Sequence, residues 1–332
     1  MSFSHPVNPN VLDRDACPPP ARALPPDPRL RWAVRTAALA GPLGDTWGDR
    51  HFGRAVADAL AALGQEVVVD TRHSLGRSTA ELDDVVLAVR GKVPLAPADG
   101  AVRLAWVISH PDLVGADELA AYDRVWAASA VWASDPARGR HVGTLLQATD
   151  PALFHPAAEH EDVERHEVLF VGSSRSVYRP VVRVLVEAGR DVAVYGGGWE
   201  RFLPPGVLRG TGVDNAALSA AYRGAGVVLN DHWDDMRRAG FASNRLFDAA
   251  ASGARVISDH VEGLGDVFGP LVRTYRDESE LLALVDEGPV GFPPDEERAR
   301  LGRRVGAEHS FAARARVLLD AALAVRAGRP GR

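Results

Sequence analysis

Three polar side chains near the start of one expected helix have types and spacing suited to binding a phosphorylated ligand. Residues 244–252 carry apolar residues at helical spacing, and Asn244, Arg245 and Asp248 occupy the polar positions between them. The run Gly226–Asn230 before them is typical of a buried parallel strand. The three side chains would then lie at the carboxyl edge of a sheet, where open α/β sheets bind ligands. An ordinary βαβ unit with solvated charges is the alternative.

A second candidate anion site is the sequence GSSR at residues 172–175, between an expected strand and an expected helix. Backbone N–H groups and the helix dipole would favour an anion there. Arg175 and Arg179 lie four residues apart, which places them on one face if the helix includes both. Together they could hold a diphosphate through charge-assisted hydrogen bonds. Many βα turns need small residues for steric reasons alone, so a purely structural role for this loop remains the alternative.

Glycine-rich loops offer further contacts. Gly196 and Gly197 would let a planar group or a ribose approach the backbone closely, because glycine has no side chain in the way. The alternative is a turn with Trp199 packed beneath it. Residues 210–214 form a second such loop before a helix, and we interpret Asp214 as its N-cap.

The loop at residues 231–235 is acidic and resembles a site for a hard metal ion. Magnesium usually takes few protein ligands and a phosphate partner, so a carboxylate cluster alone is weak support for it. We therefore expect no bound metal, and a loop that faces the ligand cleft instead. The residues assigned to substrate contact in and beside this loop are Asn230, Asp231, His232 and Ser243.

Two residues in the first half are candidate proton acceptors. His110 follows an expected strand, where Pro111 would hold the loop extended and Asp112 could orient the imidazole ring. Asp45 lies in the glycine-rich loop after the first strand. For Asp49, in the same loop, we favour a helix-capping role.

The chain alternates short apolar runs with helical patterns, which predicts parallel sheets built from right-handed βαβ units. The expected strands are 31–38, 66–70, 85–89, 104–109, 125–128, 142–146, 167–171, 191–195, 226–230 and 255–258. The expected helices are 52–63, 180–188, 215–223, 244–252, 277–287, 295–307 and 310–326.

This rhythm occurs twice, so we predict an α/β protein with two Rossmann-like domains. The predicted segments are a proline-rich tail (1–29), a first domain (30–150), a linker (151–166), a second domain (167–308) and a terminal helix with a tail (309–332). Such domains would bind ligands in the cleft between them.

Composition narrows the function classes. The 332 residues are 46% hydrophobic and 25% charged, with a net charge of -6, which argues against a general nucleic-acid or anionic-membrane binder. The single Cys17 excludes an internal disulfide, and no apolar stretch is long enough to span a bilayer. No secretory signal is visible, so we expect a cytoplasmic protein. Nucleophile-elbow, P-loop and zinc-protease motifs do not occur.

The residues also support a resemblance to a known family. The stretches 169-LFVGSSRSVYRP-180, 194-VYGGGW-199, 226-GVVLNDHW-233 and 240-GFASNRLFDAAASGARVISD-259 resemble bacterial GT-B glycosyltransferases, and within them the CgeB-type spore-protein branch. The likeness covers about residues 167–320. The first half looks like the matching acceptor domain through 45-DTWGDRHF-52 and 106-WVISHPD-112.

The resemblance implies a GT-B fold whose C-terminal helix packs back on the first domain. It also implies sugar transfer from a UDP-, GDP- or dTDP-linked donor, with no cofactor and no obligatory metal. Asp248 matches the acidic position that holds the donor ribose, and His110 matches a position near the reacting sugar. The other matched positions, for diphosphate or sugar, are Gly172, Ser173, Asn244 and Arg245.

One departure from the family pattern concerns stereochemistry. Many retaining relatives have Glu eight residues before the ribose acid, where this chain has Gly240. His110 or Asp45 would take the acceptor proton in an inverting reaction, or orient the sugar in a retaining one. A catalytically inactive binding module of a cell-surface or spore-coat assembly, and a nucleotide-sugar epimerase, are the alternatives. The sequence leaves the sugar, the base, the acceptor and the oligomeric state open.

Overall fold

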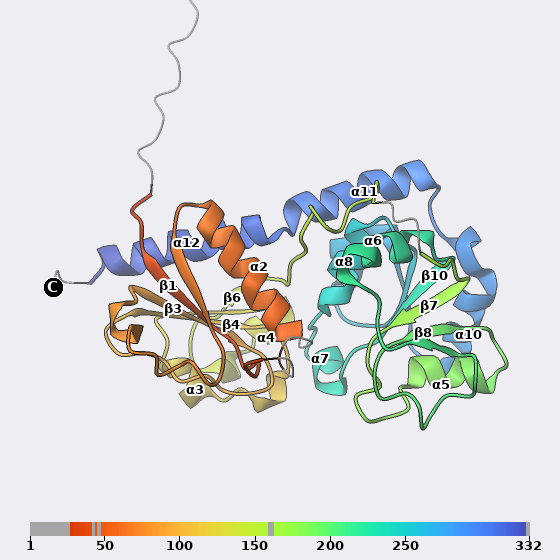
Figure 1. The fold of residues 1–332 in the computed structure, drawn as a ribbon, viewed down its shortest axis with the longest axis horizontal. Helices are drawn as coiled ribbons and strands as arrows, with labels where there is room; N and C mark the ends of the chain where they lie inside the picture. The colour runs from red at the N-terminus through yellow and green to blue at the C-terminus, as the bar shows by residue number, and fades with distance from the viewer. Residues whose placement is uncertain (1–26, 42–43, 45–47, 159–162, 330–332) are drawn as a thin grey trace, which may run out of the picture.

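The computed structural model describes residues 27–41, 44, 48–158 and 163–329. Asp45, most of the proline-rich tail and part of the predicted linker lie outside these residues. Within them the chain forms two parallel sheets of six strands each, with orders β2-β1-β3-β4-β5-β6 and β12-β11-β10-β7-β8-β9 (Figure 1). No helix in the described ranges is long and apolar enough to cross a membrane.

The N-terminal sheet is buried on both faces. Its central strand β3 has six residues, all buried, as expected for a parallel strand between helical layers. One face packs on the helices α2 (Gly48–Ala62) and α12 (Phe311–Ala327), where Phe52 contacts Trp106 and Phe311 edge to face. The strands are β1 (Arg31–Arg35), β2 (Glu66–Asp70), β3 (Val85–Arg90), β4 (Val102–Val107), β5 (Arg124–Ala127) and β6 (Gly143–Thr144).

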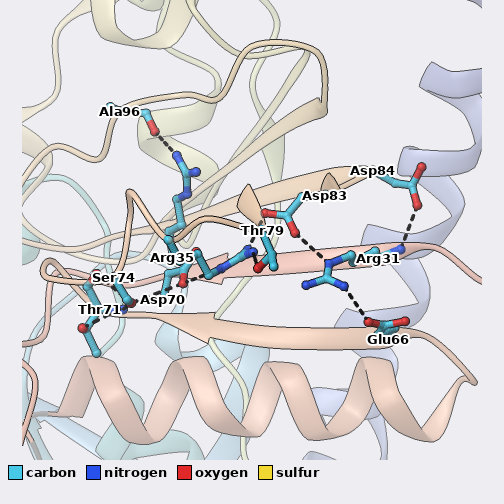
Figure 2. A network of polar contacts seen from close by, with 11 residues as sticks. Arg31, Arg35, Glu66, Asp70, Thr71, Ser74, Thr79, Asp83, Asp84 and Ala96 are labelled. Atoms are coloured by element: carbon cyan, nitrogen blue, oxygen red, sulfur yellow. Dashed lines mark hydrogen bonds and ion pairs between the residues drawn. The ribbon is translucent and has the colours of Figure 1, made fainter. Parts of the chain in front are cut away.

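The other face of this sheet is covered by the short helices α3 (Ala116–Ala120) and α4 (Ala130–Ala133). A network of charged groups fixes the connection between β2 and β3. Arg31 bonds to Asp83 at 3.3 Å and to Glu66 at 3.0 Å, as Figure 2 shows. The members of this network bond chiefly to one another, so we assign it a structural role.

The C-terminal sheet is likewise covered on both faces. Helices α5 (Pro180–Glu187) and α10 (Glu278–Glu287) pack on one face, and the helices that carry the candidate site lie on the other. The strands are β7 (Val168–Val171), β8 (Ala193–Tyr195), β9 (Leu208–Gly210), β10 (Val227–Asn230), β11 (Val256–Asp259) and β12 (Val272–Tyr275). The remaining helices are α6 (Asn215–Gly224), α7 (Asp234–Arg238), α8 (Asn244–Ala251), α9 (Leu264–Phe268) and α11 (Asp295–Glu308).

The chain crosses between the two halves twice, and the crossings are bonded to each other. Thr149 in the first crossing donates its N–H to the His309 carbonyl at 2.9 Å and accepts from the Phe311 N–H at 3.1 Å. The buried Arg314 donates to the carbonyl oxygens of Leu146 and Glu308, one in each crossing. After the second crossing α12 runs back along the N-terminal half beside α2, as predicted (Figure 1).

A further contact between the halves is made by the segment 233–241, which contains α7. Its residues Met236 and Phe241 are buried in the core of the N-terminal half, and Phe241 packs edge to face on Trp132. The Ser129 hydroxyl donates to the Ala239 carbonyl at 2.6 Å. The two halves therefore meet at α7 as well as at the two crossings.

Candidate functional site

The candidate site lies where the order of the C-terminal strands reverses. Strand β7 pairs with β8 on one side and with β10 on the other. The loops after β7 and β10 therefore diverge at this point, which is where open parallel sheets bind ligands. The helix α8 begins beside them, so the expected placement of Asn244, Arg245 and Asp248 at the carboxyl edge is confirmed.

The backbone of the loop after β7 differs from the helix predicted to carry Arg175 and Arg179. Arg175 has φ 58 and Ser176 has φ 64, both in the left-handed region, and α5 begins only at Pro180. The prediction that Arg175 and Arg179 share a helical face is therefore wrong, because neither residue belongs to the helix. Ser173 remains exposed in this loop.

Gly196 is required by packing within the protein. It has φ 150, and a side chain there would collide with the carbonyl group of Gly172. Trp199 is fully buried beneath this turn and donates its indole N–H to the Gly172 oxygen at 2.7 Å. This matches the alternative of a packed turn, and only Gly197 is left open to a ligand. Asp214 caps α6 by accepting from the Ala216 N–H at 2.8 Å, as predicted.

Arg179 and Asp231 form a buried ion pair. The Arg179 side chain is 2% exposed and also donates to the Ser173 carbonyl at 2.9 Å. Asp231 receives two N–H groups of this guanidinium. The expected contacts of Arg179 with a diphosphate and of Asp231 with a substrate are corrected, because the two charges satisfy each other beneath the loop. Both residues hold the loop after β7 against the loop after β10.

His232 and Asn230 also have internal partners instead of facing a cleft. The His232 Nδ1 lies 2.6 Å from an Asp259 oxygen, and its Nε2 accepts the Ser243 N–H at 3.0 Å. Both ring nitrogens are thus engaged, which corrects the expectation that His232 contacts a substrate. Asn230 is fully buried, and its Oδ1 accepts from the Ser243 hydroxyl at 2.9 Å and from Arg245 at 3.0 Å. These bonds fix the first residues of α8, where Ser243 is the N-cap position.

Three guanidinium groups gather at this point. Arg245 lies against the backbone of Gly172, where a side chain would begin 2.5 Å from its Nη2. Burial, together with the positive charge of Arg245, lowers the pKa of Arg175 to about 10. Burial and the positive charges of Arg245 and Arg175 also lower the pKa of Arg179. The arginines thus repel one another, with Asp231 and Asp259 as nearby carboxylates, and an anion would relieve that repulsion.

Asp248 is held one turn into α8. Its carboxylate accepts from the Thr149 hydroxyl at 2.7 Å and from the Asn244 amide at 2.8 Å. Burial raises the pKa of this carboxyl group to about 7, although both hydrogen bonds favour the ionised form. Asp248 therefore connects the candidate site to the first chain crossing.

His110 lies in contact with the C-terminal half of the protein. Its ring centroid lies 5.7 Å from that of Trp233, and the Arg175 guanidinium lies over the same indole, 4.4 Å from its centroid. Burial lowers the pKa of His110, so the imidazole is neutral at pH 7 and able to accept a proton. The structure brings His110 and Arg175 together through Trp233.

The surroundings of His110 correct one expectation. The residue itself is left-handed at φ 53, and Pro111 begins a short 3₁₀ helix instead of an extended loop. The ring Nδ1 lies 3.0 Å from the Ser109 hydroxyl, whereas Asp112 pairs with Arg238 at 2.7 Å. Ser109 therefore orients the ring, and Asp112 joins the two halves.

The acidic loop does not converge on one point. Asp234 is exposed on α7, and Asp235 accepts the Met236 N–H at 2.8 Å. Within the part of the chain that the structure describes, no three His, Cys, Asp or Glu side chains form a group able to hold a metal ion.

Gly240, which stands at the acidic position of the familiar retaining motif, lies at the contact between the halves. It has φ 74, and a side chain would begin 3.0 Å from the Ser129 hydroxyl and 3.1 Å from Val131. Both the backbone conformation and the packing therefore favour glycine here.

A cavity of about 780 Å³ adjoins the site. Asn244, Asp248 and Asn215 line its C-terminal side, and α2 with Ser109 lines its N-terminal side. Two residues that contact candidate site residues were not predicted from the sequence. Trp233 was overlooked beside its acidic neighbours, and Thr149 gives no local signal because its partner is distant in the chain.

Comparison with known proteins identifies the fold. Residues 175–320 match a family model described as glycosyl transferase-like. AviGT4, a glycosyltransferase involved in avilamycin A biosynthesis, is 18% identical, with a TM-score of 0.58 over 90% of this chain and 99% of that chain. The protein has the GT-B fold.

Two further GT-B structures are similar over most of their length. Sucrose-phosphate synthase from Thermosynechococcus elongatus is 16% identical, with a TM-score of 0.63 over 91% of this chain and 100% of that chain. The T4 phage enzyme BGT, in complex with UDP and Mn²⁺, is 12% identical, with a TM-score of 0.54 over 88% and 98%. A search of curated proteins finds no match.

Proposed function

We propose that this GT-B protein transfers a sugar from a nucleotide-activated donor to an acceptor nucleophile. The observation that carries the proposal is the cationic group of Arg175 and Arg245 at the strand-order reversal of the C-terminal sheet. It lies beside the N-terminus of α8, whose dipole also favours an anion. The glycosyl transferase-like match covers these residues.

The donor would lie across the C-terminal half. Its diphosphate would contact Arg175, Arg245 and the backbone of the loop at Gly172 and Ser173, with Gly197 open beside it. The ribose hydroxyls would donate to Asp248, whose carboxylate lines the adjoining cavity together with Asn244. This arrangement uses charged side chains that the structure leaves partly exposed.

The reaction then needs charge stabilisation and a proton acceptor. The acceptor oxygen bonds to the anomeric carbon while the bond from that carbon to the diphosphate breaks, and the diphosphate leaves with the electron pair. Arg175 and Arg245 stabilise that growing negative charge. In an inverting reaction the neutral imidazole of His110 takes the acceptor proton.

Metal independence is part of the proposal. In many sugar transfers a divalent cation neutralises the leaving diphosphate, and here two guanidinium groups and a helix N-terminus would do so. The placement within the CgeB-type branch and a cytoplasmic location stay predictions.

A donor screen tests the proposal. UDP-, GDP- and dTDP-sugars are added to the purified protein, and the thermal midpoint of unfolding is measured, since a ligand of the folded state raises it. We expect at least one donor to bind and to be hydrolysed slowly without an acceptor. Donor binding with no turnover against many acceptors would favour a binding module. An isomerised donor sugar would favour an epimerase.

A further inference from the structure

The cavity beside the donor site has two different walls. The C-terminal wall carries the polar side chains Asn215, Asn244 and Asp248. The opposite wall is largely apolar and is formed by α2, the first chain crossing and the start of α12. Its apolar members include Phe52, Ala55, Ala59, Leu153, Phe154 and Phe311.

The first half is already expected to bind the acceptor; we propose that this acceptor, held on the α2 side of the cavity, is a small molecule with an apolar body, hydroxyl groups and no anionic group. The inference rests on the proposed function and specifies its second substrate.

The size and composition of the cavity support a small molecule. Pockets for drug-sized ligands have volumes of roughly 300–1,000 Å³ and mainly hydrophobic walls. At about 780 Å³ the cavity has room for part of the donor on one wall and for a compact acceptor on the other. Apolar side chains on α2 would gain from burying an apolar acceptor surface.

The charges around the cavity disfavour an anionic acceptor. Among the residues that the structure describes, Asp49, Asp58 and Asp150 line it together with one arginine, Arg54. Asp49 lies against the backbone of Gly91, where a side chain would begin 2.7 Å from its Oδ2. Burial raises the pKa of Asp49, because loss of solvent disfavours the charged carboxylate and nearby cations do not offset that loss. Asp49 can bond to a hydroxyl group of the acceptor, and the carboxylates of Asp58 and Asp150 would repel an anionic acceptor.

The same wall leads to the proposed proton acceptor. Ser109 lines the cavity and lies 3.0 Å from the Nδ1 of His110. An acceptor packed on α2 can therefore present a hydroxyl group near His110 while its apolar body stays over Phe52 and Ala55.

The test is a pair of tryptophan substitutions on one helix. Ala55→Trp places a large ring in the cavity from its apolar wall, and Ala62→Trp places the same ring on the exposed side of α2. The probes are a naphthol and its carboxylate derivative. Saturable binding is followed by naphthol fluorescence, and transfer is followed by nucleotide release from the donor found in the screen.

We expect naphthol to be glycosylated and its carboxylate derivative to react with kcat/KM at least about tenfold lower. Ala55→Trp should weaken naphthol binding about tenfold or more, while donor affinity in both variants stays within about twofold of wild type.

Two results would overturn the inference while leaving the proposed function intact. One is a wild-type protein that binds and hydrolyses the donor but shows no saturable naphthol binding. The other is equal naphthol binding by Ala55→Trp and Ala62→Trp. A wild-type protein that binds no nucleotide sugar would refute the proposed function itself, and this inference with it.

Discussion

At the scale of single residues, the site is defined by which polar side chains are already satisfied inside the protein. Asp231 and His232 looked reactive in the sequence, yet their partners are Arg179 and Asp259. Arg245 and Asp248 have partners too, but both side chains stay partly exposed, and Asp248 lines the cavity. The proposed chemistry therefore depends on a few groups that are oriented and still able to bind a ligand.

Asp248 gives the donor site a pH dependence. Burial raises its pKa to about 7, and ribose hydroxyl groups bond more strongly to the ionised carboxylate. We expect donor affinity to increase as the pH rises from about 6 to 8, since the diphosphate of a nucleotide sugar stays fully ionised over that range. Titration calorimetry at several pH values measures this, and Asp248→Asn should bind weakly with a flat profile.

Stability changes in the opposite direction with pH. The pKa of Asp248 is higher in the folded protein than the ordinary value near 4, so the protonated carboxyl group stabilises the fold. That contribution is complete below about pH 4 and is lost as the pH rises through about 7. Denaturant unfolding of Asp248→Asn should lack this loss and be more stable than wild type at about pH 8. A donor affinity that is equal at both ends of the range and unchanged in Asp248→Asn would exclude the ribose role.

At the scale of elements, periodicity in the sequence was enough to predict the sheets. Strand 66–70 and the helix starting at Asn244 agree with β2 and α8. Strands β9 and β12 were missed because they have three and four residues, with an arginine in each. Helix α7 was missed because its sequence DDMRR is almost wholly charged. Short polar elements give no periodic signal and depend on neighbours for their structure.

The position of the two candidate loops in the fold was predicted better than the orientation of their side chains. The loops after β7 and β10 were expected to face a ligand, and they do lie at the strand-order reversal. Which side chains point inward depends on pairs distant in sequence, such as Arg179 with Asp231 or Thr149 with Asp248. Local patterns carry no information about such pairs.

Gly240 tests the contact between α7 and the N-terminal half. Gly240→Ala adds a methyl group close to Ser129 and Val131 in a left-handed backbone, so it should destabilise the protein by about 2 kcal/mol. Gly206→Ala is the matched control, because Gly206 has φ 87 and open space around it. Denaturant unfolding should show a larger loss for Gly240→Ala. Equal losses would mean that backbone strain alone determines the effect.

At the scale of the whole molecule, the donor site is bonded to the chain crossings. Thr149 bonds to His309 and Phe311 of the second crossing and, through its hydroxyl group, to Asp248. A ligand on Asp248 therefore contacts a side chain that is bonded directly to the first chain crossing.

Thr149→Val removes that hydroxyl group and keeps the side-chain shape. Because the hydrogen bond lowers the pKa of Asp248, its loss should move the midpoint of the pH-dependent donor affinity above about 7. Donor affinity at neutral pH should fall about fivefold. Thr149→Ser, which retains a hydroxyl group, should behave as wild type in the same calorimetric titrations. If the midpoint of the pH-dependent donor affinity is unshifted in Thr149→Val, the chain crossing has no influence on the donor site.

The central claim is that Arg175 and Arg245 bind the diphosphate of a nucleotide sugar, and equilibrium titration with the donor tests it most directly. Arg245→Gln should weaken that binding about tenfold or more, whereas Arg223→Gln, on the exposed side of α6, should leave it within about twofold. Equal affinities in wild type and both variants, or no nucleotide-sugar binding by the wild type, would contradict the claim.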